Sequence, residues 1–129
     1  MAMQGLFSVG IGAMLGAWMR WGLSVLLNPV MPLLPLGTLT SNLIGAYVIG
    51  LVLGYVDHVQ MLSPAIRLFL TTGFLGGLTT FSTFSGETTN LLMRGEYLWA
   101  VATISANLFG SLLLTIAGVA TIALIRSAN

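Results

Sequence analysis

Residues 63–87 read SPAIRLFLTTGFLGGLTTFSTFSGE, and this stretch decides the fold. It contains an uncharged run of 19 residues between Arg67 and Glu87. The predicted span at residues 65–92 would, as one helix, extend about 42 Å at about 1.5 Å per residue. In the middle of that segment stand Gly76-Gly77 and the β-branched pair Thr79-Thr80, all of them weak helix formers. We therefore predict two helical pieces separated by a break.

The composition of the chain places this break inside a membrane. Of the 129 residues, 57% are hydrophobic and 5% are charged, whereas soluble domains carry about a quarter charged residues. A water-soluble globule of this size cannot hide so much apolar surface, which excludes a soluble enzyme and a disordered chain. The sequence has no Cys, one His and four scattered Arg, so a thiol or His-built metal site and a nucleic-acid-binding surface are not expected.

Charged and proline residues divide the chain into four predicted transmembrane helices, since a span needs about 20 mostly apolar residues. The helices cover roughly residues 5–27, 37–56, 65–92 and 97–125, and prolines at 29, 32 and 35 separate the first two. We expect an all-α integral membrane protein with a single four-helix domain over residues 1–129. Gly12-x-x-x-Gly16 and Gly50-x-x-x-Gly54 have the spacing of close helix packing, and we assign them no chemistry.

The basic residues give the chain no preferred orientation. Arg67 and Arg126 lie near one end of the predicted bundle, and Arg20 and Arg94 lie near the other. A chain with balanced ends inserts both ways, which allows an antiparallel, dual-topology homodimer. Two alternatives stay open: one loop binds an orientation factor, or Arg20 lies too deep to count.

A helix break at mid-membrane frees backbone carbonyl groups that lipid cannot satisfy. Freed carbonyls suit a hard cation, so in a two-fold dimer they would enclose one small structural cation such as Na⁺. A glycine kink healed by water explains the same sequence equally well.

Aromatic and polar residues after the break suggest a path for an anion. Phe81 and Phe84 share a helix face, and phenyl ring edges are electropositive. Hydroxyls accompany them at residues 80, 82, 83 and 85, and polar residues recur at every fourth position of the last span: Thr103, Asn107, Ser111 and Thr115. Asn42 in the second span also needs partners inside the membrane. The alternatives are core packing for the phenyl rings and bonds to their own backbone for the hydroxyls.

Of the ionisable residues, Arg20 and Glu87 are the main candidate functional groups, because a charge inside a membrane span is costly. Arg20 lies deep in the first span, unless its long side chain reaches back to the interface. Glu87 follows Phe84 by three residues, where it would face a vestibule of the pathway.

The sequence GFLGGLTTFSTFS at residues 73–85, with GTLxxNLxG at residues 37–45, resembles the Fluc (CrcB) family of fluoride channels. The resemblance extends through all four spans. It implies a dual-topology, antiparallel homodimer in the bacterial inner membrane that conducts F⁻ passively out of the cell through two pores along the subunit interface, and so confers fluoride resistance.

The resemblance also implies residue roles. Phe81 and Phe84 would line the anion path with their ring edges, and Asn42 would donate a hydrogen bond to the ion. The backbone carbonyls of Gly76 and Thr79, from both subunits, would hold a central Na⁺. A polar track beside the phenyl rings would comprise Ser82, Thr83 and Glu87. Many relatives read Tyr-x-x-x-Ser-Leu-Leu-Leu-Gly in the last span, where this chain has TISANLFG, so the resemblance assigns no role to Thr103, Asn107 and Ser111.

Two other classes of protein compete with a channel. A small proton-coupled exporter of drugs or other cations is also dimeric and dual-topology, but it needs an acidic residue deep in a span, for which Glu87 is the only candidate. A structural subunit of a larger assembly leaves the phenylalanine and hydroxyl sequence unexplained.

Overall fold

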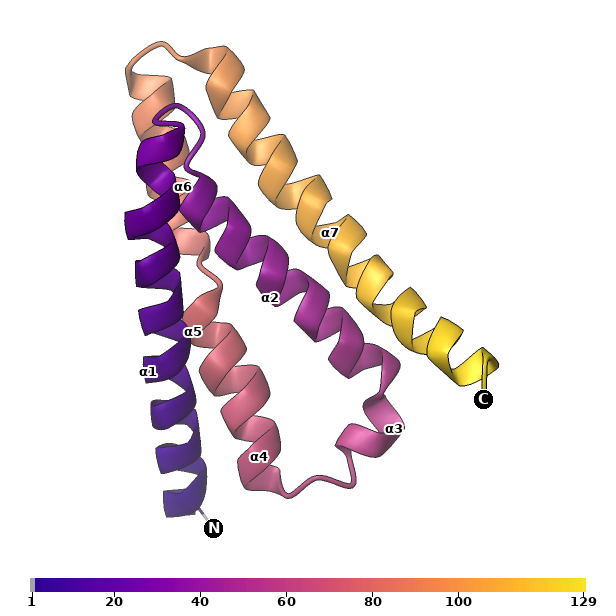
Figure 1. Cartoon of the computed structure of the whole chain (residues 1–129). Helices are drawn as coiled ribbons and strands as arrows, with labels where there is room; N and C mark the ends of the chain where they lie inside the picture. The colour runs from indigo at the N-terminus through magenta and orange to yellow at the C-terminus, as the bar shows by residue number, and fades with distance from the viewer. Residues whose placement is uncertain (1) are drawn as a thin grey trace.

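The computed structural model describes residues 2–129, without the side chain of Asp57. Within that part of the chain every regular element is helical, which confirms the all-α prediction (Figure 1). Three helices are long and apolar enough to cross a membrane: α1 (Ala2–Leu27), α2 (Leu36–Gly54) and α7 (Tyr97–Ser127). Their bounds lie within a few residues of the predicted spans, and a short helix, η1 (Asn28–Val30), follows α1 at the first proline.

The remaining span is interrupted, as predicted. After the short α3 (Val56–Val59), it begins with α4 (Pro64–Leu68), continues as η2 (Phe69–Leu75) and α5 (Gly76–Leu78), and resumes as α6 (Phe81–Met93). Thr79 and Thr80 between the two halves are extended, with ψ angles of 151° and 118°. The glycine pair itself remains helical, so the threonine pair forms the break.

The threonine pair favours the break through its hydroxyls as well as its backbone. Thr80 is the N-cap of α6, because its Oγ1 accepts a hydrogen bond from the Thr83 N–H at 3.1 Å. Thr79 Oγ1 donates to the carbonyl of Leu75 at 2.8 Å, one turn back. Side-chain bonds of this kind offer the backbone an alternative to the helical ladder.

The helix η2 is a π-helix, which the sequence analysis did not anticipate. The hydroxyl of Thr71 donates to the Arg67 carbonyl at 2.8 Å, four residues earlier. Threonine bonds of this type loosen and bend a helix. Thr71 lies inside η2, so this bond is a local cause of the wide turn.

The glycine motifs serve close packing, as predicted. Gly12 and Gly16 of α1 lie against the backbone of η2 and α5, and a methyl group at either position would strike the carbonyl oxygen of Phe69 or Phe74. On the other side of the molecule, Gly50 of α2 meets Gly118 of α7. The chain thus forms two helix pairs, α1 with η2 and α5, and α2 with α7.

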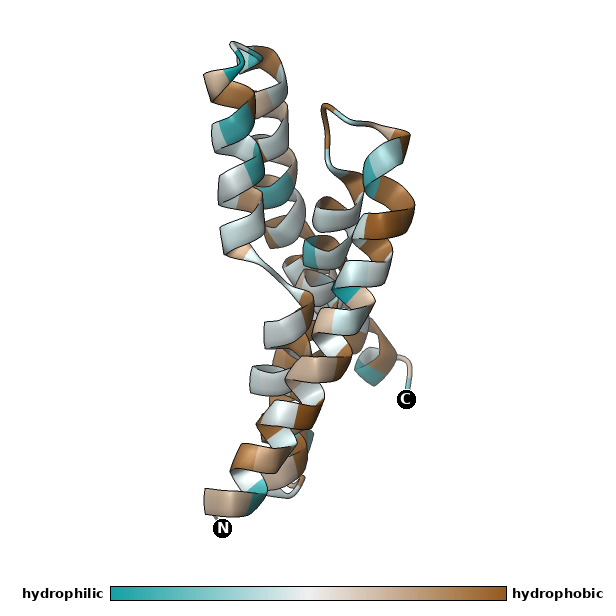
Figure 2. Ribbon diagram, turned by 90° about the vertical axis from the view of Figure 1, so that its left-hand side faces the viewer, coloured by the Kyte–Doolittle hydropathy of each residue, from teal (hydrophilic) through white to brown (hydrophobic). Residues whose placement is uncertain are grey.

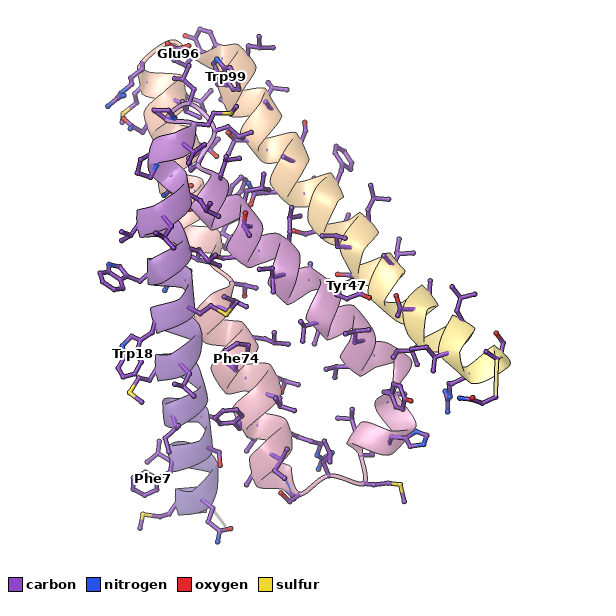
Figure 3. The ribbon with its side chains drawn as sticks, in the orientation of Figure 1. Phe7, Trp18, Tyr47, Phe74, Glu96 and Trp99 are labelled. Carbon is purple, nitrogen blue, oxygen red and sulfur yellow. The ribbon has the colours of Figure 1, made fainter. Side chains whose placement is uncertain are left out.

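The two pairs meet near the connections at residues 31–35 and 94–96 and diverge toward the other end (Figure 1). Tyr47 lies between α2 and α7, where its hydroxyl bonds to Thr121 Oγ1 at 3.0 Å (Figure 3).

Large apolar side chains are exposed on the outer side of the molecule. Phe7 and Trp18 point outward from α1 and are 62% and 60% exposed (Figure 3). The ribbon is hydrophobic over most of its lower half, and hydrophilic positions recur among the upper helices (Figure 2). Large apolar side chains exposed in this way are typical of a chain surrounded by lipid or by a second copy.

Candidate functional site

Asn42 of α2 holds the break in the third span. Its Oδ1 accepts a hydrogen bond from the Thr80 N–H at 2.8 Å, and its Nδ2 donates to the Thr80 carbonyl at 3.2 Å. The amide therefore satisfies both backbone groups of Thr80. The prediction that Asn42 finds partners inside the membrane is confirmed, and the first of these partners is the backbone at the break.

Asn107 of α7 continues this set of hydrogen bonds. Asn42 Nδ2 donates to Asn107 Oδ1 at 2.9 Å, and Asn107 Nδ2 donates to the Thr103 carbonyl at 3.0 Å. The side chain of Asn107 is 8% exposed. Three elements that are distant in sequence are thereby joined through two amides: α2, the break and α7.

Phe81 and Phe84 occupy the first turn of α6, directly after the break. Their ring centroids are 5.6 Å apart and the ring planes meet at 63°, an edge-to-face arrangement. Phe81 is 80% exposed, although large aromatic side chains usually bury most of their surface. Phe81 is therefore not a core residue of a single chain.

A cavity of about 540 Å³ lies between α2, the broken helix and α7. Seven of the predicted site residues line it: Asn42, Gly76, Thr79, Phe81, Phe84, Asn107 and Ser111. No acidic residue belongs to its lining within the described chain. The N-terminus of α6, which carries a partial positive charge, also lies at this cavity, because Thr80 and Phe81 are among its lining residues. An uncharged cavity with amide and hydroxyl groups beside a helix N-terminus suits an anion better than a cation.

Ser82, Thr83 and Thr103 do not line this cavity. Thr83 Oγ1 accepts a hydrogen bond from Thr80 Oγ1 at 3.0 Å, and Ser82 Oγ lies 3.4 Å from the same atom. Thr103 is 1% exposed, and its hydroxyl oxygen has no hydrogen-bond partner within the described residues. Its backbone carbonyl receives the bond from Asn107. Of the four polar residues in the stripe of the last span, Asn107, Ser111 and Thr115 line the cavity and Thr103 is buried in the interior.

Glu87 lies less than one helical turn beyond Phe84, but in a different environment. Its Oε1 accepts a hydrogen bond from Thr38 Oγ1 at 2.6 Å, and Thr38 itself is 1% exposed. Together with Asn28, Asn90 and Arg94, Glu87 lines a second cavity of about 230 Å³. The carboxylate thus belongs to a small polar pocket near the connections at residues 31–35 and 94–96.

The carbonyls predicted to hold a cation belong to Gly76, the first residue of α5, and to Thr79 at the break. The Thr80 N–H, which in a continuous helix would bond to the Gly76 carbonyl, donates to Asn42 instead. Gly76 is exposed, and both Gly76 and Thr79 line the cavity. Carbonyl oxygens are ligands of hard cations, so these two residues fit a Na⁺ site if a second copy supplies further oxygens.

Arg20 contacts the backbone of the broken helix. Its Nε donates a hydrogen bond to the Gly77 carbonyl at 3.0 Å, beside the break. Of the two placements left open by the sequence, the structure supports the deep one. A charged hydrogen bond at this point offsets the loss of a helical donor to Gly77.

Sequence reasoning missed two of these contacts, Arg20 with Gly77 and Thr38 with Glu87. The partners are 57 and 49 residues apart. For the first contact, the charge of Arg20 inside a predicted span indicated that the side chain needs a partner, but not which residue supplies it. Nothing in the sequence pattern singled out Thr38 beyond its place in the segment at residues 37–45.

Comparisons with known proteins agree with this architecture. Residues 7–119 match the family described as CrcB-like protein, Camphor Resistance (CrcB). A protein of Nitrosospira multiformis is 53% identical over 122 residues, which cover 95% of each chain, and one of Pseudomonas putida is 52% identical over 119 residues, which cover 92% of this chain and 94% of the relative.

A more distant relative, from Nitrosomonas europaea, is 46% identical over 122 residues, which cover 95% of this chain and 96% of the relative. All three relatives are named fluoride-specific ion channel FluC. The resemblance noted from the sequence is confirmed, and with it the expectation of a multi-pass protein of the bacterial inner membrane. This chain belongs to the CrcB family.

Proposed function

We propose that the chain forms a channel that conducts fluoride passively and selectively across the bacterial inner membrane, and so gives fluoride resistance. The observation that carries this proposal is the cavity at the helix break. Phe81 and Phe84 line it, the N-terminus of α6 opens beside it, and no acidic residue belongs to its lining in the described chain. The names of the relatives point to the same ion.

The chemistry of the cavity suits a small, strongly hydrated anion. Electropositive ring edges contact an anion and disfavour a cation. Amide and hydroxyl groups of Asn42, Asn107 and Ser111 stand beside the rings, where hydrogen bonds to the ion would replace its water shell. Ser82, Thr83 and Glu87 would continue the polar path along α6 toward the second cavity.

The working unit is an antiparallel homodimer. Three side chains of the cavity lining remain largely exposed in the single chain: Phe81 at 80%, Leu108 at 51% and Leu112 at 55%. A cavity with so much exposed apolar lining is incomplete, and packing against a second copy would cover these side chains and close the cavity. Two such copies related by a two-fold axis would create two equivalent pores.

The same two-fold arrangement would bring the carbonyls of Gly76 and Thr79 from both subunits together. Four carbonyl oxygens around a Na⁺ would neutralise the partial charges that the break exposes. This ion would be structural, since its role is to hold the two breaks together.

A proton-coupled cation exporter fits the geometry less well. Its carrier carboxylate would have to be Glu87, yet Glu87 is bonded to Thr38 and lies in the smaller cavity, away from the break. Among the described residues, the lining of the larger cavity includes no carboxylate that would bind a cation or carry a proton.

The test separates the two classes by their driving force. Purified protein is placed in liposomes loaded with KF, and valinomycin releases K⁺ without any pH gradient. We expect release of F⁻. The proposal fails if F⁻ stays trapped and the same liposomes transport a hydrophobic cation only when a pH gradient is imposed.

A further inference from the structure

The second cavity combines two opposite charges with amide groups. Its volume is about 230 Å³, and its polar lining consists of Asn28, Glu87, Asn90 and Arg94. Glu87 Oε1 accepts a hydrogen bond from Thr38, whereas Glu87 Oε2 has no hydrogen-bond partner within the described residues. The exposed Arg94 therefore shares the cavity with the carboxylate but makes no hydrogen bond to its second oxygen.

Negative charge at this cavity would impede an anion that moves along α6. The carboxylate of Glu87 is one source of that charge. The C-terminus of α6 is another, because Arg94 is the C-cap of this helix and the last carbonyl groups of a helix carry a partial negative charge. Within the described chain, Arg94 is also the one cationic residue of the cavity lining. Its charge thus lies where it can offset both sources.

Asn28 adds an uncharged donor to the same cavity. Its Oδ1 accepts a hydrogen bond from the Gly37 backbone N–H at 2.7 Å. Because a backbone N–H can only donate, the amide atom that faces Gly37 is the oxygen. The amide nitrogen is therefore the atom of Asn28 that remains for a ligand in the cavity. Amide and guanidinium N–H groups are both donors to anions.

We propose that Arg94 allows F⁻ to pass Glu87. Its guanidinium offsets the negative charge of the carboxylate and of the α6 terminus, and with Asn28 it binds the anion at this end of the pathway. This inference rests on the proposed channel function. A purely structural role, the usual stabilisation of a helix C-terminus by a cation, is the alternative. The two roles differ because only the first makes flux depend on Arg94 and on its relation to Glu87.

Flux through charge variants of Arg94 tests the proposal. Efflux of F⁻ from liposomes loaded with KF is measured with valinomycin and without a pH gradient. In Arg94→Met we expect efflux to fall about fivefold, the effect of a unit charge a few ångströms from the ion in a solvated site. In Arg94→Lys, which keeps the charge, we expect efflux close to that of the wild type. Unchanged efflux in Arg94→Met overturns the proposal, and so does an equal loss in Arg94→Lys.

Arg126→Met is the matched control. Arg126 is another exposed arginine in the last turn of a helix, but it lines neither cavity, and its guanidinium lies 5.9 Å from the centroid of the Tyr55 ring. In an antiparallel dimer, Arg126 of one copy and Arg94 of the other would lie at the same side of the membrane. We expect unchanged efflux in Arg126→Met. An equal loss in both variants would assign the effect to general surface charge and overturn the proposal.

A double substitution tests the relation between Arg94 and Glu87. In Glu87→Gln, a side-chain oxygen can still accept from Thr38, but the negative charge is removed. If Arg94 offsets that charge, Arg94→Met lowers efflux by less than about twofold in the Glu87→Gln background. The same fold-loss in both backgrounds would show that Arg94 does not act on Glu87, contrary to the proposal.

The outcomes separate this inference from the channel proposal itself. If wild-type protein conducts no F⁻, the proposed function fails whatever Arg94 does. If wild-type protein conducts F⁻ and Arg94→Met conducts it equally well as an intact dimer, only the role of Arg94 is overturned. If Glu87→Gln conducts too little F⁻ for the double substitution to be measured, the contrast between Arg94→Met and Arg94→Lys decides.

Discussion

Phe81 stands directly after the helix break and exposes 80% of its side chain in the single chain. Replacement by isoleucine therefore removes no core contact, but it does remove the ring edge from the cavity. We expect Phe81→Ile, and likewise Phe84→Ile, to lower F⁻ efflux from liposomes while the dimer elutes unchanged in size-exclusion chromatography. Undiminished flux in both variants would show that the rings do not line the path.

Arg20 satisfies a carbonyl that the break would otherwise leave alone in the membrane. In Arg20→Met the side chain has no N–H group, so the Gly77 carbonyl loses its donor. An unsatisfied buried polar group costs about 1–3 kcal/mol, and we expect the free energy of unfolding to fall by that amount. Thermal unfolding in detergent, followed by tryptophan fluorescence, measures it.

Arg94→Met is the control for Arg20→Met, because Arg94 is exposed beyond the end of α6. Equal thermal stability of Arg20→Met and the wild type would contradict the assigned role of the Arg20–Gly77 bond.

The identity of the site residues was largely predictable, and their partners were not. Composition and residue type marked Asn42, Arg20 and the phenylalanine pair as unusual inside a membrane, because each carries a group that lipid does not satisfy. The bonds from Asn42 to Thr80 and from Arg20 to Gly77 connect residues 38 and 57 positions apart. Such contacts depend on how the helices pack, which the local pattern does not encode.

At the scale of elements, α1 and the broken helix approach each other so closely that only glycine fits between them. A methyl group at Gly16 would strike the Phe74 carbonyl oxygen, whereas Gly10 on the same helix has open space. We expect Gly16→Ala to destabilise the protein by about 1–3 kcal/mol, the usual cost of overpacking, and Gly10→Ala to leave it unchanged.

Thermal unfolding of the Gly16→Ala and Gly10→Ala variants in detergent checks this contrast. Equal changes in stability for the two substitutions would mean that the contact with η2 and α5 does not set the effect.

The break in the third span was predictable from its glycine and threonine pairs, whereas its form was not. The expected weak point included Gly76-Gly77, yet these residues stay helical and the extended residues are Thr79 and Thr80. The π-helical turn of η2 before the break also went unanticipated. At both places threonine hydroxyls bond to the backbone: those of Thr71 and Thr79 to a carbonyl four residues earlier, and that of Thr80 to the Thr83 N–H. Such bonds compete with the helical hydrogen bonds, and average helix propensities do not capture them.

At the scale of the whole molecule, the position of Arg20 changes the charge balance between the two ends. Because Arg20 is engaged beside the break, the terminal cations are Arg67 and Arg126 at one end and Arg94 at the other. A difference of one charge is a weak bias, so we still expect both orientations in the membrane.

Reporter fusions to the C-terminus measure this expectation. We expect both a cytoplasmic and a periplasmic reporter to be active in wild-type cells, and added arginines at residues 31–34 to shift the population toward one orientation. Activity of one reporter alone in the wild type would contradict dual topology.

The central claim is that the closed dimer selects fluoride among anions and lets it pass without a coupled ion. The most direct measurement is the efflux of F⁻ and of Cl⁻ from matched liposomes that contain the same purified protein, with valinomycin and no pH gradient. We expect rapid release of F⁻, with Cl⁻ retained as in protein-free liposomes. Equal release of both ions, or retention of both, would contradict it.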